Sequence, residues 1–197
     1  MADDADRIAE LEQRLTDESG RFRRLVEVGA LLNSTLNLNE LLEQILRSAT
    51  DLLRAESASL LLLDEHTDEL RFAVLAGDAP MVLADQRLPS GRGIAGWALS
   101  ERKSAVVDDP KTDARFYAGV DETSAFDTRN LVAVPLLVKD RAIGVMEVLN
   151  KVGGGFTKLD LEVAEALASF AAVAIDNATM YASLAEAVVT ARMSYRL

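Results

Sequence analysis

Apolar residues recur at helical spacing near both ends of the chain, around a centre of shorter apolar segments. Near the N-terminus they fall at heptad spacing, at Ile8, Leu11, Leu15, Phe22, Leu25 and Leu32. A narrow apolar edge of this kind is typical of a helix that pairs with another helix. It predicts an N-terminal dimerisation helix over residues 1–35, and the alternative is an amphipathic helix that folds onto its own domain.

Two further helices are predicted, at residues 38–53 and from about residue 157. Asn39 is the expected N-cap of the first, and Thr157 followed by Asp160 provides an N-cap and a first-turn acid for the second. The second helix carries a long stripe that is apolar except for Asn177: Leu159, Val163, Leu167, Phe170, Ala174, Asn177, Tyr181, Leu184 and Val188. Because this stripe is longer than one domain needs to cover its core, the helix is expected to project beyond the domain.

Between these helices the apolar segments are short and Val-rich, as is typical of strands. The predicted strands are residues 57–63, 69–76, 104–107, 131–138 and 142–149. Polar turns separate the first two strands and the last two, which predicts two antiparallel hairpins. A helix that starts among the glycines near Gly93 and ends near Glu101 lies between the hairpins. This order of elements predicts an α+β domain with an antiparallel sheet covered by helices.

Composition limits the partners and the location. The 197 residues, 49% of them hydrophobic, suit one domain with helical extensions. The net charge is −11 and no basic cluster interrupts it, so no nucleic-acid partner is expected. No apolar run approaches the ~20 residues of a membrane span, and the N-terminus MADDADR is acidic where a signal peptide is basic. The sequence therefore predicts a cytoplasmic protein that does not enter a membrane.

The chain has no cysteine and one histidine. This excludes disulfides, thiolate metal sites, a thioether-linked bilin and cysteine redox chemistry. His66 lies in the polar turn EHTD and is interpreted as an exposed turn residue without a role. Asp108 and Asp109 precede Pro110 in an ordinary turn, so no metal and no cofactor are expected. Because no nucleophile, base and orienting group can be assembled, the protein is not expected to be an enzyme.

Residues 116–130, FYAGVDETSAFDTRN, combine polar side chains with three aromatic ones. This mixture suits a loop or short helix that holds a small polar ligand. Glu147 interrupts an apolar strand, and a buried carboxylate there needs a hydrogen-bond donor from the protein or a ligand. The glycines of GRGIAG surround a helix start whose free amides could meet a phosphate. The alternative is that they only permit a tight turn and the packing of Trp97.

The segment 116–130 resembles the ligand-capping region of a GAF domain, of the branch found in cyclic-nucleotide phosphodiesterases and cyanobacterial adenylyl cyclases. The strings FY, GVD and F-x-T-R-N carry this resemblance. Asn150, Lys151, Phe156 and Asp160 resemble the N-K-x(n)-F-x(3)-D-E signature of the family, although Leu161 stands where the family has Glu.

The resemblance extends over residues 36–185, which are the expected GAF domain, with its C-terminal helix from about residue 157. Residues 186–197 are expected to be a helix extension or linker. The family implies a six-stranded antiparallel sheet flanked by helices, with a ligand pocket between the sheet and the capping helices. It also implies that a Lys151–Asp160 ion pair joins the last strand to the long helix, outside the pocket.

Carried over residue by residue, the resemblance implies a binding site for cyclic AMP or cyclic GMP. The implied ligand-binding residues are Ser59, Leu75, Ala76, Ile94, Ala95, Phe116, Tyr117, Asp121, Ser124, Thr128 and Glu147, with Thr123 as the alternative to Ser124. Guanine-preferring relatives often have an acid near the position of Ala76, so cyclic AMP is slightly favoured over cyclic GMP.

The resulting prediction is a regulatory sensor domain that binds a cyclic purine nucleotide without chemistry. It is expected to form a homodimer and to signal through its C-terminal helix to an effector domain in a longer parent protein. Two alternatives remain open at this point. One is a GAF sensor of another small metabolite, and the other is a ligand-free GAF dimerisation module, which would have a filled or collapsed pocket.

Overall fold

The computed structural model describes residues 7, 20 and 37–194 of the chain. Its elements are α2 (Leu38–Leu53), β1 (Ala55–Asp64), β2 (Glu69–Gly77), the 3₁₀ helix η1 (Met81–Asp85), β3 (Arg87–Pro89), α3 (Gly93–Glu101), β4 (Ala105–Val107), the 3₁₀ helix η2 (Pro110–Thr112), α4 (Gly119–Ser124), β5 (Leu131–Val138), β6 (Arg141–Lys151) and α5 (Lys158–Ser194). The predicted N-terminal dimerisation helix, residues 1–35, lies outside the described residues except at positions 7 and 20.

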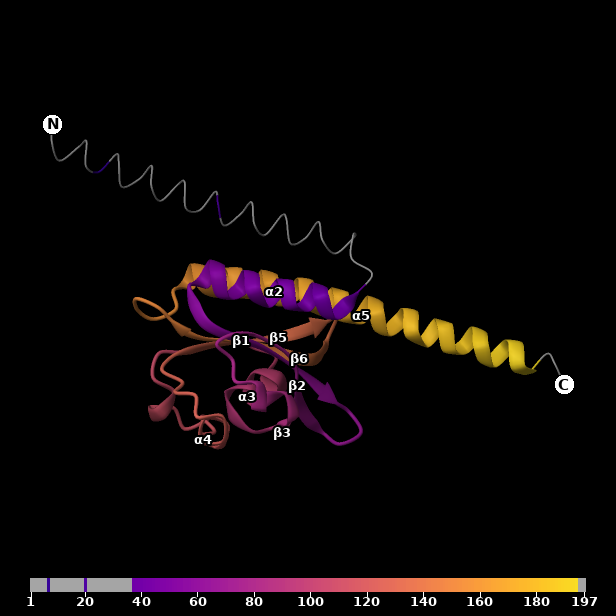
Figure 1. Cartoon of the computed structure of the whole chain (residues 1–197), viewed down its shortest axis with the longest axis horizontal. Coiled ribbons are helices and arrows are strands. Elements are labelled where there is room, and N and C mark those ends of the chain that lie inside the picture. Colours follow the sequence, from indigo (N-terminus) through magenta and orange to yellow (C-terminus); the bar gives the residue numbers. More distant parts are fainter. Residues whose placement is uncertain (1–6, 8–19, 21–36, 195–197) are drawn as a thin grey trace.

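The six strands form one antiparallel sheet in the order β3-β2-β1-β6-β5-β4. Figure 1 shows α2 and α5 on one side of this sheet and α3 and α4 on the other. The predicted α+β class with a six-stranded antiparallel sheet flanked by helices is therefore confirmed. Since side chains alternate along a strand, each strand contributes to both faces.

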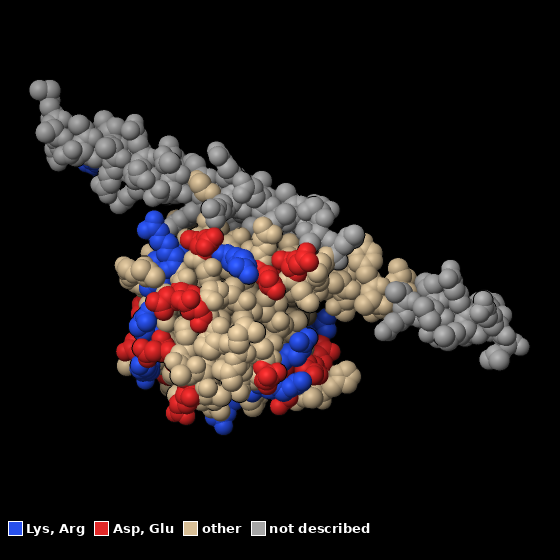
Figure 2. Space-filling model, viewed as in Figure 1, with Lys and Arg blue, Asp and Glu red and all other residues tan. Residues whose placement is uncertain are grey.

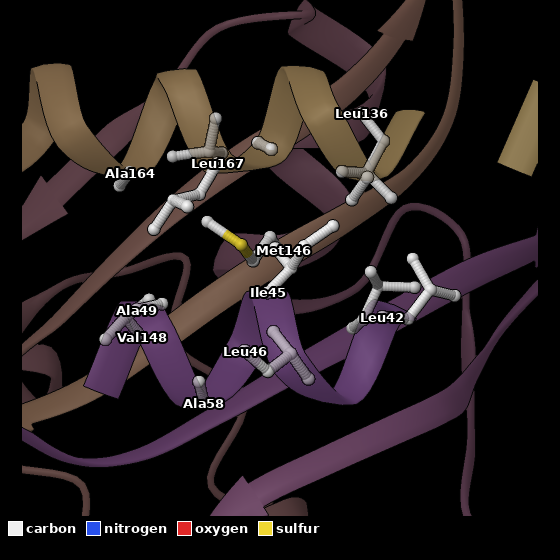
Figure 3. Close-up of a cluster of buried hydrophobic side chains, with 14 of the residues drawn as sticks. Leu42, Ile45, Leu46, Ala49, Ala58, Leu136, Met146, Val148, Ala164 and Leu167 are labelled. Carbon is white, nitrogen blue, oxygen red and sulfur yellow. The ribbon is translucent and has the colours of Figure 1, made fainter. Parts of the chain in front are cut away.

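The face under α2 and α5 is closed by a continuous apolar core, part of which Figure 3 shows. Ile45 and Leu46 of α2 pack there with Met146 of β6 and Leu167 of α5, and all four side chains are fully buried. The helix α2 places six buried apolar residues at helical spacing, which explains why the predicted and observed bounds of this helix agree.

Two local features differ from the expectation. The N-cap of α2 is Asn37 and not Asn39, because the Asn37 side chain accepts a hydrogen bond from the Asn39 N–H at 3.1 Å. The three-residue strand β3 pairs with β2 and was not predicted from the pattern. It is short and ends at a proline, so it gives almost no periodic signal.

The helix α5 has 37 residues, and Figure 1 shows that its C-terminal part continues past the end of the sheet. Thr157 and Asp160 cap it reciprocally, because each side chain accepts a hydrogen bond from the backbone N–H of the other. Its first half is buried against the sheet, whereas Tyr181 and Leu184 are exposed. Within the described residues, no helix combines the length and the apolar character that crossing a membrane requires.

Candidate functional site

A cavity of about 60 Å³ lies between the sheet and the helices α3 and α4. Its lining residues are Phe72, Leu88, Arg92, Gly93, Ile94, Ala95, Phe116, Tyr117, Val120, Asp121, Thr128, Leu131, Glu147 and Leu149. A second space of about 30 Å³ shares Asp121, Thr128 and Glu147 with it and extends to Ser59 and Ser124. The two spaces together form the inner cavity. It is much smaller than the roughly 300 Å³ or more that a small-molecule pocket usually has.

Glu147 lies in the middle of β6, directly opposite Ser59 on β1 and Ala133 on β5. Its side chain is half-buried and lines the inner cavity, and it makes no hydrogen bond or ion pair with another described residue. Burial and, secondly, the nearby Asp121 carboxylate raise the pKa of Glu147 to about 7. A donor from a ligand would therefore find an acceptor here that the protein leaves without a partner.

Ser59 is the neighbour of Glu147 across the strand pair, so the two side chains project from the same face. Its side chain is 2% exposed, and its Oγ is buried without a hydrogen-bond partner. Buried polar atoms are rarely left in this state, because each lost hydrogen bond costs about 1–3 kcal/mol. Two polar groups on adjacent strands are thus available to a ligand in the inner cavity.

The roof of the inner cavity is tied down by Asp121 of α4. Its carboxylate accepts hydrogen bonds from the Thr128 N–H at 2.8 Å and from the Thr128 hydroxyl at 2.7 Å. Thr128 is buried just before β5, so this Asp121–Thr128 clasp fixes the short helix α4 to the sheet. It also turns the Thr128 hydroxyl toward Asp121 and away from the role of a free donor.

The structure brings most of the expected ligand-binding residues together. Those that line the inner cavity are Ser59, Ile94, Ala95, Phe116, Tyr117, Asp121, Ser124, Thr128 and Glu147. Leu75 lies on the same face of the sheet but lines neither part of the cavity. Thr123 is exposed and donates to the Gly119 carbonyl, whereas Ser124 donates to the Val120 carbonyl.

Ala76 is not brought to this site. It pairs with Ala58 across β1 and β2, and both side chains are buried in the core beneath α2 and α5. The expectation that Ala76 faces the ligand is therefore corrected, because Leu75 and Ala76 are consecutive on one strand and point to opposite faces. The preference for cyclic AMP loses its basis, since it depended on this side chain.

The signature residues lie outside the inner cavity, at the end of β6. The Lys151 ammonium group pairs with the Asp160 carboxylate, which confirms the expected link between β6 and α5. Burial alone would raise the pKa of Asp160, but hydrogen bonds from Lys151 and Thr157 hold it below its usual range. The Lys151 ammonium also lies 5.9 Å from the centre of the Phe156 ring.

Asn150 joins the cap to the sheet through its side chain. Its Oδ1 accepts from the Arg129 N–H at 2.8 Å, and its Nδ2 donates to the Asp127 carbonyl at 2.9 Å and to Glu56 at 3.0 Å. Arg129 completes this cluster with an ion pair to Glu56 at 2.5 Å. Glu56 and Arg129 were not among the expected site residues, because they lie far apart in the sequence.

Arg92 and Val120 also line the inner cavity without having been predicted. The one feature of the sequence that could have pointed to Arg92 is its position between Gly91 and Gly93, at the start of α3. His66 is exposed in the turn after β1, where its N–H donates to Asp64. Across the part of the chain that the structure describes, no three His, Asp or Glu side chains are arranged to hold a metal ion.

Two of the relatives that match this chain in sequence are described as 3',5'-cyclic phosphodiesterases. The Caenorhabditis elegans protein "Probable 3',5'-cyclic phosphodiesterase pde-5" is 26% identical over 161 residues, which cover 77% of this chain and 22% of the relative. The Mus musculus protein "Cone cGMP-specific 3',5'-cyclic phosphodiesterase subunit alpha'" is 33% identical over 121 residues, which cover 61% of this chain and 14% of the relative. The chain thus spans about a fifth or less of the length of these two proteins.

Solved structures of other GAF domains share the fold. The GAF domain of a phosphoenolpyruvate-protein phosphotransferase from Coxiella burnetii superposes with a TM-score of 0.76 at 16% identity, over 83% of this chain and 96% of that one. The corresponding domain from Acinetobacter gives 0.71 at 18% identity, over 83% and 97% of the two chains. The sequence model of the GAF domain matches residues 35–176, which is well over half of the chain. The chain therefore belongs to the GAF domain family of regulatory sensor domains.

Proposed function

We propose that this domain binds a cyclic purine nucleotide in the inner cavity, without catalysing a reaction on it. The observation that carries the proposal is the pair formed by the Glu147 carboxylate and the Ser59 hydroxyl, which lie side by side at the floor of the cavity and have no partner in the described part of the chain. A ribose hydroxyl or a base amine can donate a hydrogen bond to the Glu147 carboxylate. The Ser59 hydroxyl can donate to a ring nitrogen of the base or accept from an N–H or O–H group of the ligand. The apolar and aromatic walls suit a purine ring.

A nucleotide can enter only if the roof moves, because the inner cavity holds about 60 Å³ and about 30 Å³ in its two parts. Such a movement has to release the Asp121–Thr128 clasp and displace α4, a helix of six residues that ends at Ser124. We take the described structure as the closed form. A ligand that binds the open form more tightly shifts the population toward it.

The choice between the two cyclic nucleotides is left to titration. The side chain of Ala76 faces the opposite core, so it gives no reason to prefer cyclic AMP. The mouse relative is described as cGMP-specific, which makes cyclic GMP at least an equal candidate.

For the output, we propose a homodimer that signals through α5 to an effector domain in a longer parent protein. Two hydrogen bonds tie the segment after the roof to the end of β6, from the Arg129 N–H to Asn150 and from the Lys151 N–H to Asn130 at 2.8 Å. The Lys151–Asp160 ion pair then ties this end of β6 to α5. Beyond the sheet, α5 exposes Met180, Tyr181 and Leu184, which pairing with a second copy would cover.

A second candidate is a sensor of a smaller metabolite that carries an amine or several hydroxyls. The size of the inner cavity and its two carboxylates, Asp121 and Glu147, favour a small hydrogen-bond donor over an anion. The third candidate is a dimerisation module that binds no ligand. The small volume of the inner cavity agrees with it. The partnerless Glu147 and Ser59 count against this third reading, because a surface without a ligand has no use for them.

Calorimetric titration of the ligand-stripped protein with cyclic AMP and cyclic GMP tests the proposal. Saturable heat and a rise in melting temperature with either nucleotide are expected, because a ligand that binds the native state stabilises it. No response to either nucleotide would reject the proposal. Native mass spectrometry of the protein as purified then separates the alternatives, since a copurified amine or polyol supports the metabolite sensor and no bound molecule supports the ligand-free module.

A further inference from the structure

Arg92 lies at the boundary between two spaces. It precedes α3 and lines both the inner cavity and an outer groove of about 290 Å³ on the surface. The outer groove is lined by Gly91, Arg92, Gly93, Trp97, Ser100, Ala114, Arg115, Phe116 and Tyr117. The four residues common to both spaces are Arg92, Gly93, Phe116 and Tyr117, so they form a partition between them.

The charge of Arg92 is exceptional in its surroundings. Among the described residues that line the inner cavity, it is the one cationic side chain, and Asp121 and Glu147 are the acids. The chain as a whole carries a net charge of −11. A monoanionic phosphodiester that enters this cavity meets two carboxylates, and Arg92 is the side chain able to neutralise it.

The guanidinium of Arg92 is also available. It makes no ion pair or hydrogen bond with another described residue, and it lies over the Tyr117 ring at 5.3 Å from the ring centre. Arg115, which also lines the outer groove, provides the contrast. It also stacks on an aromatic ring, that of Trp97 at 4.4 Å, but its charge is already used in a bidentate pair with Asp113 at 2.9 and 2.6 Å.

We propose that Arg92 is the anion-binding residue of the ligand site, and that its stack on Tyr117 is the closed gate between the outer groove and the inner cavity. This inference rests on the proposed function. An exposed cation–π contact is weak, whereas a guanidinium paired with a phosphodiester forms charge-assisted, bidentate hydrogen bonds. When Arg92 leaves the Tyr117 ring and pairs with the phosphate, it exchanges a weaker contact for a stronger one, and this exchange favours the open gate.

Opening this gate also supplies the missing space. With Phe116 and Tyr117 displaced, the inner cavity, with its parts of about 60 Å³ and about 30 Å³, and the outer groove of about 290 Å³ become continuous. Their combined volume reaches the lower range of small-molecule pockets, roughly 300 Å³. The purine would then lie over the sheet, and its phosphate would remain at the mouth beside Arg92.

The test compares a charged with an uncharged ligand. Calorimetric titrations with cyclic GMP, cyclic AMP and the neutral nucleosides guanosine and adenosine are made on the parent, Arg92→Gln, Arg92→Lys and Arg71→Gln. Arg71 is the matched control, because it is an exposed arginine on β2 that lines neither space and its replacement removes the same charge.

We expect Arg92→Gln to weaken binding of the preferred cyclic nucleotide by roughly 10- to 100-fold and to leave nucleoside binding within about twofold. Arg92→Lys should retain part of the affinity, since it keeps the charge and loses the bidentate geometry. Arg71→Gln should behave like the parent. Raising the salt concentration should weaken the parent more than Arg92→Gln.

Equal cyclic-nucleotide affinity in Arg92→Gln and the parent would overturn the inference while leaving the proposed function intact. An equal loss for nucleotides and nucleosides would also overturn it, because the effect would then not depend on the phosphate. A parent protein that binds no cyclic nucleotide rejects the proposed function, and the inference with it.

Discussion

The two faces of the sheet are built from the same strands and carry an apolar cluster each, but they differ in how completely they are packed. On β6, Met146 is fully buried in the core beneath α2 and α5, and the next residue, Glu147, lines the inner cavity on the other face without a partner among the described residues. The first face is covered by two long helices and closed by apolar side chains, as Figure 3 shows. The second face is covered by the short helices α3 and α4 and retains cavities.

This difference shows how one sheet can carry a closed core on one face and a cavity lined by polar groups on the other. Close packing under α2 and α5 contributes to the free energy of folding, as does the second apolar cluster around Leu61 and Leu70 on the other face. Ser59 and Glu147 can then remain without partners among the described residues beside the inner cavity. The space-filling view in Figure 2 shows that charged side chains surround a largely uncharged area of the surface in this view.

The first prediction concerns the packed face. Met146→Ala should lower the free energy of unfolding by about 2 to 5 kcal/mol, because it removes a fully buried side chain and leaves a cavity in the core. Urea denaturation measures this change. Leu137→Ala is the control, because Leu137 lies on β5 and is 42% exposed, and it should cost much less. Equal effects of the two substitutions would contradict the assignment of this face.

The second prediction concerns the link between the sheet and α5. Asp160→Ala should destabilise the protein by about 2 to 4 kcal/mol, because Asp160 is 1% exposed and its loss leaves the Lys151 charge without its partner and removes the cap on Thr157. Glu162→Ala is the control on the same helix. Glu162 is exposed, and its ion pair with Lys158, at 3.8 Å, is a surface contact that should contribute little to stability. Identical melting curves for both variants would show that the pair is a surface contact.

The third prediction concerns pH and the cavity face. The pKa of Glu147 in the folded protein, about 7, is above its unfolded value of about 4.5. Below about pH 4.5 the carboxyl is protonated in both states, so it does not change the free energy of unfolding. As the pH rises from 4.5 toward 7, the unfolded state releases this proton more readily, so the free energy of unfolding falls. Glu147→Gln should therefore raise the free energy of unfolding at pH 8 by about 1 to 3 kcal/mol, since the side chain is partly solvated. At pH 4 the variant and the parent should be nearly equal. A variant that is less stable than the parent at pH 8 would show that Glu147 has a stabilising partner.

The fourth and smallest effect concerns the roof. Thr128→Val should lower the free energy of unfolding by about 1 to 2 kcal/mol, because it removes the buried hydroxyl that donates to Asp121 at 2.7 Å and keeps the shape of the side chain. The control is Thr123→Val. Thr123 is exposed on α4, and its hydroxyl donates a hydrogen bond to the Gly119 carbonyl of the same helix. Hydrogen exchange of residues 119–130 should rise in Thr128→Val and not in the control. No difference would mean that the clasp does not hold the roof.

The fold could be predicted largely from the sequence because its main elements carry strong periodic signals. The bounds 38–53 and 131–138 were predicted as observed, since apolar positions and turns define both segments. The strand β3 was missed because three residues ending in Pro89 have no period to detect. The N-cap could not be assigned from the sequence, because Asn37 and Asn39 are the same residue type and either side chain can cap a helix. Only the backbone of the structure shows that the helix begins after Asn37.

The site could be predicted only where motif residues coincide with one face of the sheet. Asp121, Thr128 and Glu147 lie together as the resemblance implied, but Ala76 does not, because a resemblance read along the chain assigned two consecutive strand residues to one face. The Asp121–Thr128 clasp depends on how residues 121–128 fold back on themselves, which the pattern did not contain. The Arg92–Tyr117 stack joins positions 25 residues apart, and no spacing rule connects them.

The division between the two faces, and with it the binding of a cyclic nucleotide, can be tested most directly by methyl NMR. Isoleucine and leucine methyl groups are labelled, and the ligand-stripped protein is titrated with cyclic GMP and with cyclic AMP. Binding should shift Ile94 and Leu149, which line the inner cavity, and leave Ile45 and Leu46 beneath α2 essentially unchanged. Spectra that do not change with either nucleotide, or shifts centred on Ile45 and Leu46, would contradict the account.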